Sequence, residues 1–295
     1  MEEYLKIRKD WLKSDTARDK GLTEPDGIVR YDNIAYGPDK KWNLLDLYMP
    51  GKHSSPVSVI VSIHGGAYVY GTKEIYQYYG MNMALRGFAF VNFNYRLAPE
   101  NKFPAALCDT GMVMDWIEEN AGEYGLDIEN IFVLGDSAGA HYASLYCAAY
   151  SNPNYADFIS LKVNKNIKIR ACALNCGLYD PLLICPRDGL ENATEYMIGA
   201  DWRKKAPEYL QTANFLNQDF PPTYLMSGTN DFLLPQLEPF KEQLEKHGIE
   251  CSSRVYGDEE PERAYHVFHV DMRNRFQKQC NDDEAEFFRK HINIT

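Results

Sequence analysis

The sequence lacks any apolar run that approaches the roughly 20 residues a helix needs to cross a bilayer. It also lacks the apolar core of a secretory leader, because its first residues, MEEYLKIRKD, carry charges throughout. Basic residues are too few to balance the acidic ones, and the formal net charge is −11. These absences argue against a membrane-spanning protein and disfavour nucleic acid or an anionic membrane as a partner.

Paired cysteines are also missing, since the seven cysteines are scattered, odd in number and contain no CxxC motif. This pattern predicts reduced thiols, most of them buried fillers, in a cytoplasmic protein. No group of histidine, aspartate and glutamate residues has the spacing of metal ligands. We therefore expect neither a metal ion nor a cofactor.

Strand-like and helix-like segments alternate along most of the 295 residues. Short apolar runs rich in β-branched and aromatic residues predict strands. The predicted strands are residues 57–63, 88–93, 131–134, 169–174, 223–227 and 252–256, with an edge strand at 44–49. The predicted helices are residues 75–86, 104–120, 140–150 and 235–247, with a closing helix that starts near Asn281 and has Asp282, Asp283 and Glu284 in its first turn. This alternation is typical of an α/β fold with a mostly parallel sheet covered on both faces.

Neither an internal repeat nor an interdomain linker is evident, so we expect a single domain over residues 1–295. The polar N-terminal stretch predicts one amphipathic helix and then a loop, packed as an appendage on the domain. Residues 181–220 contain several prolines and glycines and interrupt the alternation of strands and helices, which indicates a lid or binding loop. Residues 153–166 are expected to be a surface connection.

The stretch IFVLGDSAGA at residues 131–140 has the Gly-x-Ser-x-Gly pattern around Ser137. A serine between two glycines is often a simple turn, and the five-residue pattern alone is weak. Here a buried strand precedes it and an alanine-rich helix follows, which is the context of a nucleophile elbow. No cysteine stands in such a context, so Ser137 is the candidate nucleophile.

A serine hydroxyl needs a base near neutral pH. Asp231 follows the strand at 223–227, and His266 follows the last strand after an acidic loop. The order Ser137, Asp231, His266 is the order of the α/β-hydrolase triad. Two alternatives stay open: Asp180 also follows a strand and is a reserve acid, and His269 could replace His266 as the base.

The strand at 57–63 runs into His64, Gly65, Gly66 and Ala67. A glycine pair after a strand can leave backbone N–H groups free to hold an oxyanion. We therefore expect the oxyanion donors among Gly65, Gly66, Ala67 and Ala138.

The remaining histidines, and several tyrosines, can be explained by structural roles alone. His64 is expected to brace its loop, and His141 to be a packed or surface residue in a helix. His53, His247 and His291 carry no signal. Five tyrosines either line a substrate cleft or are simply half-buried, and they are Tyr68, Tyr70, Tyr76, Tyr78 and Tyr79.

Four motifs together resemble the hormone-sensitive-lipase-like esterases of the α/β-hydrolase fold. They are HGGA at 64–67, YRLAPE at 95–100, GDSAG at 135–139 and HVF at 266–268. The resemblance implies an eight-stranded, mostly parallel sheet with a helical cap from about residues 1–40 and 181–215. It also implies a serine hydrolase of small or short-acyl carboxylic esters that works through an acyl-enzyme on the triad Ser137, Asp231 and His266.

The chain departs from the family pattern at Ala67, Ala140 and Asn94. None of these differences alters an expected catalytic role. An amidase or peptidase with the same triad stays open. So does a non-catalytic ligand-binding relative, although such relatives typically lack the histidine that this chain keeps at His266. The expected partner is a small-molecule ester, and the resemblance leaves a homodimer open.

Overall fold

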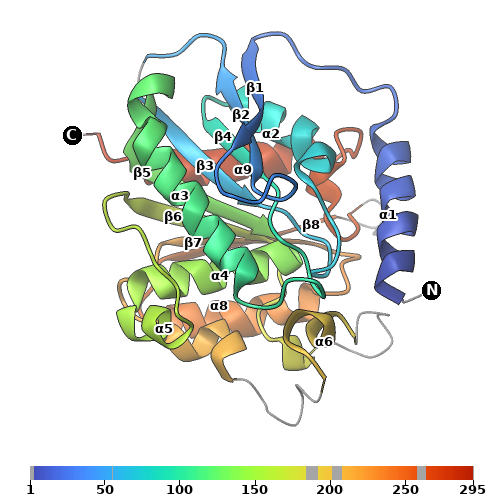
Figure 1. The fold of residues 1–295 in the computed structure, drawn as a ribbon, viewed down its shortest axis with the longest axis vertical. Helices are drawn as coiled ribbons and strands as arrows, with labels where there is room; N and C mark the ends of the chain where they lie inside the picture. Colours follow the sequence, from blue (N-terminus) through green and yellow to red (C-terminus); the bar gives the residue numbers. More distant parts are fainter. Residues whose placement is uncertain (1–2, 55, 184–191, 201–207, 258–263, 295) are drawn as a thin grey trace.

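The computed structural model describes residues 3–54, 56–183, 192–200, 208–257 and 264–294. They form one eight-stranded sheet with helices on both of its faces (Figure 1). The strand order is β1-β2-β4-β3-β5-β6-β7-β8. The pairs β1–β2 and β2–β4 are antiparallel, and every later pair is parallel. The predicted fold class is therefore confirmed.

Strands β2 to β8 lie close to predicted positions, and β1 is additional. The strands are β1 Ile28–Ala35, β2 Leu44–Pro50, β3 Val57–Ile63, β4 Ala89–Phe93, β5 Leu126–Asp136, β6 Ile169–Asn175, β7 Thr223–Gly228 and β8 Cys251–Tyr256.

Strand β1 was not predicted, and its presence corrects two expectations. It pairs with β2 at the outer edge, so the prediction that residues 44–49 form the edge strand is wrong. Residues 28–35, expected within the cap, belong to the sheet instead. An edge strand that is mostly exposed needs no regular apolar alternation, which is why its sequence IVRYDNIA gave no strand signal.

The described α-helices are α1 Glu3–Asp19, α2 Gln77–Ala84, α3 Ala105–Tyr124, α4 Ala138–Ser151, α5 Pro153–Phe158, α6 Ala193–Ile198, α8 Leu237–Lys246 and α9 Gln277–Lys290. Helix α5 lies where a surface connection was expected. Asn152 caps it by accepting a hydrogen bond from the amide of Tyr155, and Pro153 occupies its first turn. None of the described helices is long and apolar enough to cross a membrane.

The core consists of two apolar layers, one on each face of the sheet. Because side chains alternate along a strand, Val59 and Val61 of β3 face one layer and Ile60 faces the other. Helices α3, α4 and α8 cover the first layer, while α2 and α9 cover the second. Parts of the expected cap, residues 184–191 and 201–207, lie outside the described residues, and the division into one domain with a cap stays a prediction.

Helix α9 begins at Gln277, so the expectation that Glu284 lies in its first turn is wrong. Glu284 is buried in the middle of the helix. Its carboxylate accepts hydrogen bonds from the Asn175 side-chain amide at 2.7 Å and from the Tyr79 hydroxyl at 2.5 Å. Burial raises the pKa of Glu284 to about 7, and the two hydrogen bonds only partly oppose this.

A Glu284→Gln variant is expected to lose less stability at high pH than the parent. The pKa of an unfolded glutamate is about 4.3, so the parent becomes less stable as pH rises from there to about 7. The variant has no such titration. Asn175 can accommodate it by turning its amide over, because the Asn175 Oδ1 has no partner within the described residues.

Urea unfolding at pH 5 and pH 8 measures this effect. We expect the fall in the free energy of unfolding to be about 2–3 kcal/mol smaller for the variant than for the parent. The same fall in both proteins would contradict a buried carboxyl with a raised pKa.

Candidate active site

Ser137 stands on a tight turn between β5 and α4. Its φ of 53° lies in the left-handed region, which is strained for a serine. The flanking glycines are required by close backbone approach. A Cβ on Gly135 would lie 2.3 Å from the Gly139 carbonyl oxygen, and one on Gly139 would lie 2.0 Å from that of Ile63. The sequence therefore folds locally as the predicted strand–turn–helix, the geometry that a nucleophile elbow requires.

The structure brings Ser137, His266 and Asp231 together. The Ser137 Oγ lies 2.9 Å from Nε2 of His266, and Nδ1 of His266 lies 2.8 Å from Oδ1 of Asp231. The acid comes from the turn after β7 and the histidine from the segment after β8, as the order along the chain predicted. With its proton on Nδ1, His266 can accept the serine proton at Nε2.

The Asp231 carboxylate is buried and well supported. It accepts hydrogen bonds from the Ser227 hydroxyl at 2.8 Å and from the Leu233 amide at 2.9 Å. Burial by itself favours the neutral acid, but His266, the neighbouring Cys176 thiol and the Leu233 amide outweigh it and lower the pKa of Asp231 to about 2. The side chain is therefore a carboxylate near neutral pH, able to stabilise an imidazolium.

The loop that is expected to supply oxyanion donors, which we call the oxyanion loop, follows β3, and one of the expected donors is already engaged. The Gly65 amide donates to the Tyr76 hydroxyl at 3.0 Å and to Oδ1 of Asp136 at 3.1 Å, so including Gly65 among the oxyanion donors was wrong. In the described part of the chain, the amides of Gly66 and Ala67 have no acceptor. Ala138 begins α4, where helix amides lack partners within the helix.

A Gly66→Ala variant is expected to lower kcat by about 100-fold, because it displaces the amides of Gly66 and Ala67. The φ of Gly66 is 123°, and a Cβ there would lie 2.0 Å from the Tyr70 carbonyl oxygen. Gly87→Ala is the matched control, since Gly87 also has a positive φ, of 96°, but has open space around it. Steady-state ester hydrolysis measures both variants. Parental kcat in Gly66→Ala would contradict this placement of the oxyanion loop.

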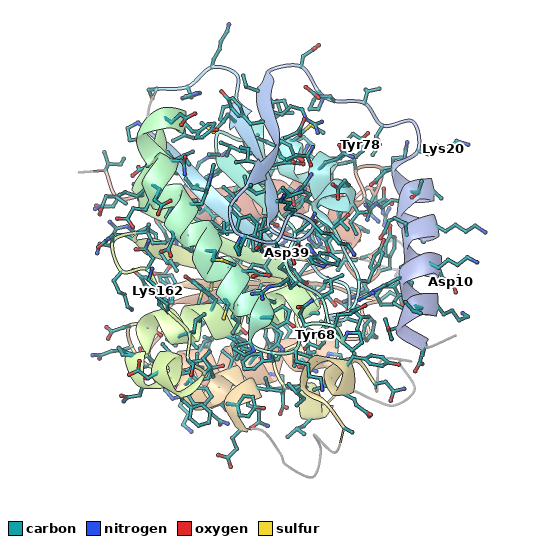
Figure 2. All side chains as sticks on the ribbon, in the orientation of Figure 1. Asp10, Lys20, Asp39, Tyr68, Tyr78 and Lys162 are labelled. Atoms are coloured by element: carbon teal, nitrogen blue, oxygen red, sulfur yellow. The ribbon has the colours of Figure 1, made fainter. Side chains whose placement is uncertain are left out.

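A cavity of about 260 Å³ opens beside Ser137 and His266. One wall is a face of α1 that carries Trp11, Ser14, Asp15 and Arg18, spaced as a helix face requires. The opposite side of α1 faces solvent, with Asp10 pointing outward, and so does Lys20, the residue after the helix (Figure 2). A larger hollow of about 600 Å³ lies at Asp39, Arg96 and Lys162, but no nucleophile and base converge there.

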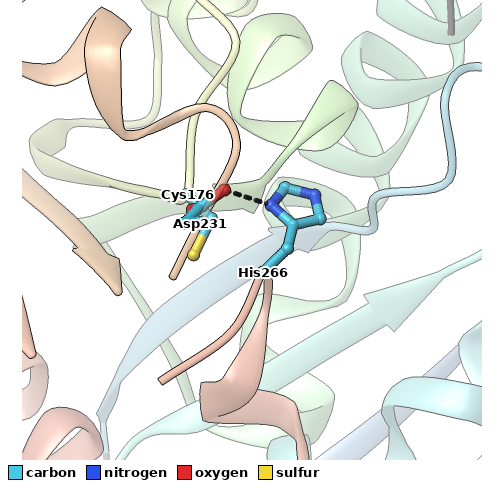
Figure 3. A group of neighbouring side chains, drawn as sticks. All are labelled: Cys176, Asp231 and His266. Atoms are coloured by element: carbon cyan, nitrogen blue, oxygen red, sulfur yellow. Dashed lines mark hydrogen bonds and ion pairs between the residues drawn. The ribbon is translucent and has the colours of Figure 1, made fainter. Parts of the chain in front are cut away.

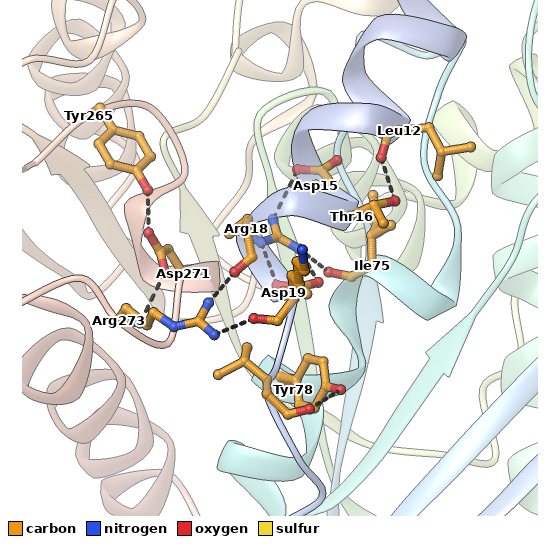
Figure 4. A network of polar contacts seen from close by, with 12 residues as sticks. Leu12, Asp15, Thr16, Arg18, Asp19, Ile75, Tyr78, Tyr265, Asp271 and Arg273 are labelled. Carbon is orange, nitrogen blue, oxygen red and sulfur yellow. Dashed lines mark hydrogen bonds and ion pairs between the residues drawn. The ribbon is translucent and has the colours of Figure 1, made fainter.

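Polar contacts hold this wall in place. The Arg18 guanidinium donates to the carboxylates of Asp15 and Asp19 and to the Ile75 carbonyl oxygen (Figure 4). The Tyr70 hydroxyl donates to Asp15 at 2.6 Å. Of the five tyrosines considered from the sequence, Tyr70 and Tyr76 line the cavity, whereas Tyr68, Tyr78 and Tyr79 do not.

The reserve acid and the alternative base lie apart from this arrangement. Asp180 accepts hydrogen bonds from Leu182 and Gln211. His269 is buried against the Tyr79 ring, and neither of its ring nitrogens has a partner within the described residues. Burial lowers the pKa of His269 to about 3, so it stays neutral near pH 7.

The other two histidines considered have structural contacts. His64 stacks on the Tyr95 ring with centroids 4.1 Å apart, and its Nδ1 lies 2.8 Å from the Gly65 carbonyl oxygen. It braces the oxyanion loop as expected. His141 is packed between the Tyr68 hydroxyl and the Leu210 carbonyl oxygen, each at 2.7 Å.

Two site residues were missed from the sequence. Asp136, next to the nucleophile, is buried, and its carboxylate accepts from the Tyr76 hydroxyl at 2.6 Å and from the Gly65 amide. Burial raises the pKa of Asp136 to about 6. Its place in the GDSAG motif was the only available signal. It secures the start of the oxyanion loop against the elbow.

Cys176 is the second missed residue. Among the described residues, Cys176, Asp231 and His266 form a group whose potential ligand atoms all lie within 4.8 Å of one another (Figure 3). Thiolate, carboxylate and imidazole are zinc ligands. Here, however, the carboxylate and the imidazole are already bonded to each other. No motif surrounds Cys176, so the sequence gave no signal for it.

Comparison with known proteins identifies a family and several relatives of this chain. The BD-FAE family model matches residues 45–243. The esterase LipQ of Mycobacterium tuberculosis is 27% identical over 87% of this chain and 63% of its own length. An acetyl esterase of Salmonella choleraesuis is 24% identical over 82% of this chain and 74% of its own length. Several other curated relatives are longer, and the chain spans about half of their length.

Solved structures share the fold. Esterase B of Lactobacillus rhamnosis, inhibited by a tributyrin phosphonate, superposes with a TM-score of 0.88 at 22% identity, covering 98% of this chain and 96% of its own. A bacterial heroin esterase superposes with a TM-score of 0.81 at 21% identity, covering 99% and 93%.

Proposed function

The chain belongs to the BD-FAE family of the α/β-hydrolase fold, and from this premise we propose that it is a serine carboxylesterase. The observation that carries the proposal is the continuous hydrogen-bonded relay from Ser137 through His266 to Asp231. The triad assignment and the oxyanion donors Gly66, Ala67 and Ala138 are part of the same proposal. The names of the curated relatives, which include several esterases, support it.

The reaction proceeds in two steps. His266 takes the hydroxyl proton as Ser137 Oγ attacks the ester carbonyl carbon, and the amides of Gly66, Ala67 and Ala138 hold the oxyanion. The ester C–O bond then breaks, His266 gives its proton to the departing alcohol, and an acyl-enzyme remains. Water, deprotonated by His266, attacks the acyl carbon and releases the acid, and the proton returns to Ser137. Asp231 orients His266 throughout and stabilises its protonated form.

Small or short-acyl esters are the proposed substrates. The cavity of about 260 Å³ beside Ser137 is at the small end for a ligand site. One relative is named an acetyl esterase, and one structural neighbour was inhibited by a tributyrin phosphonate. An amidase or peptidase would use the same relay and stays the alternative.

A series of p-nitrophenyl esters tests this proposal. We expect rapid release of p-nitrophenol from the acetate and butyrate, with kcat/KM at least about tenfold lower for chains of ten carbons or more, because these exceed the cavity. The p-nitroanilide of acetate is the matched amide and is expected to react far more slowly. No turnover of any ester would contradict the esterase, and faster anilide cleavage would favour the amidase.

A cytoplasmic location, a homodimer and the absence of nucleic-acid partners stay predictions. Size-exclusion chromatography with light scattering distinguishes a monomer from a homodimer.

A further inference from the structure

The end of β6 and the turn that follows it lie beside all three members of the proposed triad. The Asn175 carbonyl oxygen accepts the Ser137 amide at 2.9 Å, and the Leu178 amide donates to the Ser137 carbonyl oxygen at 3.4 Å. Cys176, between them, lies beside Asp231 and His266 (Figure 3). One short segment therefore touches the nucleophile, the acid and the segment that carries the base.

Cys176 has a conformation that directs its side chain inward. Its φ of 47° is in the left-handed region, which is uncommon for a residue other than glycine and is often found where function requires it. Its amide donates to the Met226 carbonyl oxygen at 2.6 Å, near the end of β7. The bend thus places a fully buried thiol under the turn that carries Asp231.

The Cys176 thiol makes two contacts there. Its sulfur lies within 4.8 Å of a carboxylate oxygen of Asp231 and of a ring nitrogen of His266. Its sulfur accepts the amide of Val267, the residue after His266, at 3.4 Å. Burial first, and then the neighbouring Asp231 carboxylate, raise the pKa of the Cys176 thiol, so the sulfur keeps its proton near neutral pH and can offer it to that carboxylate.

We propose that Cys176 is a positioning residue of the active site, which joins Asp231 to the backbone beside His266 through its thiol. The inference rests on the proposed esterase function. The thiol acts as a donor to Asp231, which belongs to the relay, and as an acceptor for the amide of Val267, which adjoins His266. It also draws negative charge of the carboxylate away from His266, so that it tunes the basicity of the imidazole as well as its place.

Cys176→Ala removes both contacts and is the first test. We expect kcat for p-nitrophenyl acetate to fall about tenfold with KM within twofold of the parent, because the relay and not the binding cavity is disturbed. The acid limb of the pH profile of kcat/KM is expected to move to higher pH by a few tenths of a unit. The reason is that the Asp231 carboxylate, without the thiol beside it, stabilises protonated His266 more strongly.

The other titratable groups near His266 are the same in parent and variant. Among the residues that the structure describes, they are Asp231, Asp136, Tyr76, the neutral His269 and, from α1, Asp15 and Arg18. A shift of the acid limb of the pH profile therefore measures the effect of removing the Cys176 thiol.

Cys176→Ser and Cys172→Ala are the matched variants. A serine hydroxyl offers the same donor and acceptor, and we expect it to restore kcat to within about threefold of the parent and to return the acid limb. Cys172 is a buried thiol on β6 whose sulfur contacts the Thr223 hydroxyl, away from the relay. Its replacement by alanine is expected to change thermal stability but neither kcat nor the acid limb.

The outcomes separate this inference from the function it rests on. A parent protein that hydrolyses no ester contradicts the function itself. An active parent with parental kcat and acid limb in Cys176→Ala overturns only the positioning role. The role is likewise overturned if Cys172→Ala has the same effect, or if folded Cys176→Ser is no better than Cys176→Ala.

Discussion

Replacing Ser137 by alanine is expected to lower kcat for p-nitrophenyl acetate by at least about 10⁴-fold. The change removes the hydroxyl oxygen that lies 2.9 Å from Nε2 of His266 and on which acyl transfer depends. The fold should persist, because the hydrogen bonds that hold the turn come from the Ser137 backbone, to Asn175 and Leu178. Initial rates, with the thermal unfolding midpoint as a check on folding, measure the effect.

Ser144→Ala is the matched control for this substitution. Ser144 also lies on α4 and is buried, but its hydroxyl contacts the His141 carbonyl oxygen and Thr212 and does not line the cavity. We expect this control to keep kcat within about twofold of the parent. Undiminished turnover in Ser137→Ala, or equal losses in both variants, would contradict the nucleophile assignment.

Replacing His266 by alanine is expected to have an effect of similar size, again at least about 10⁴-fold in kcat. Without the imidazole, the serine has no base, and Asp231 is left without its partner at 2.8 Å. The acid limb that reports the imidazole should also disappear from the pH profile of the residual activity. Steady-state rates between pH 5 and pH 9 measure both effects.

His269→Ala resolves the alternative that the sequence left open. His269 is fully buried, and its replacement leaves a cavity, so we expect a lower thermal midpoint but kcat within about tenfold of the parent for the folded protein. The reverse result, with His269→Ala inactive and His266→Ala active, would exchange the roles of the two histidines.

Much of the fold could be predicted because its signals are local. The strand β3 is a continuous apolar run, and Gly135 and Gly139 report a steric constraint that any strand-to-helix elbow of this kind imposes. Strand β1 could not be predicted in the same way, since an exposed edge strand has no pattern of burial to encode. Glu284 was misplaced because a run of acids also suits a helix start, and only the packing of α9 shows that its side chain is buried.

The same distinction, between features with a local signal and features that depend on packing, applies to the site. The order of Ser137, Asp231 and His266 follows from chain topology, so the sequence was sufficient to predict that these three side chains meet. Whether an amide is free depends on its neighbours in space, and the contacts of Gly65 with Tyr76 and Asp136 cannot be inferred from a glycine pair. Cys176 meets Asp231 only because β6 and β7 are adjacent.

Covalent trapping tests the central claim most directly. A p-nitrophenyl alkylphosphonate with a short chain should transfer its phosphonyl group to the serine oxygen, with release of one p-nitrophenol for each active site. We predict a single adduct by intact mass spectrometry, mapped by peptide sequencing to Ser137 and absent from Ser137→Ala and His266→Ala. An adduct on another residue, or labelling that persists in Ser137→Ala, would contradict the account.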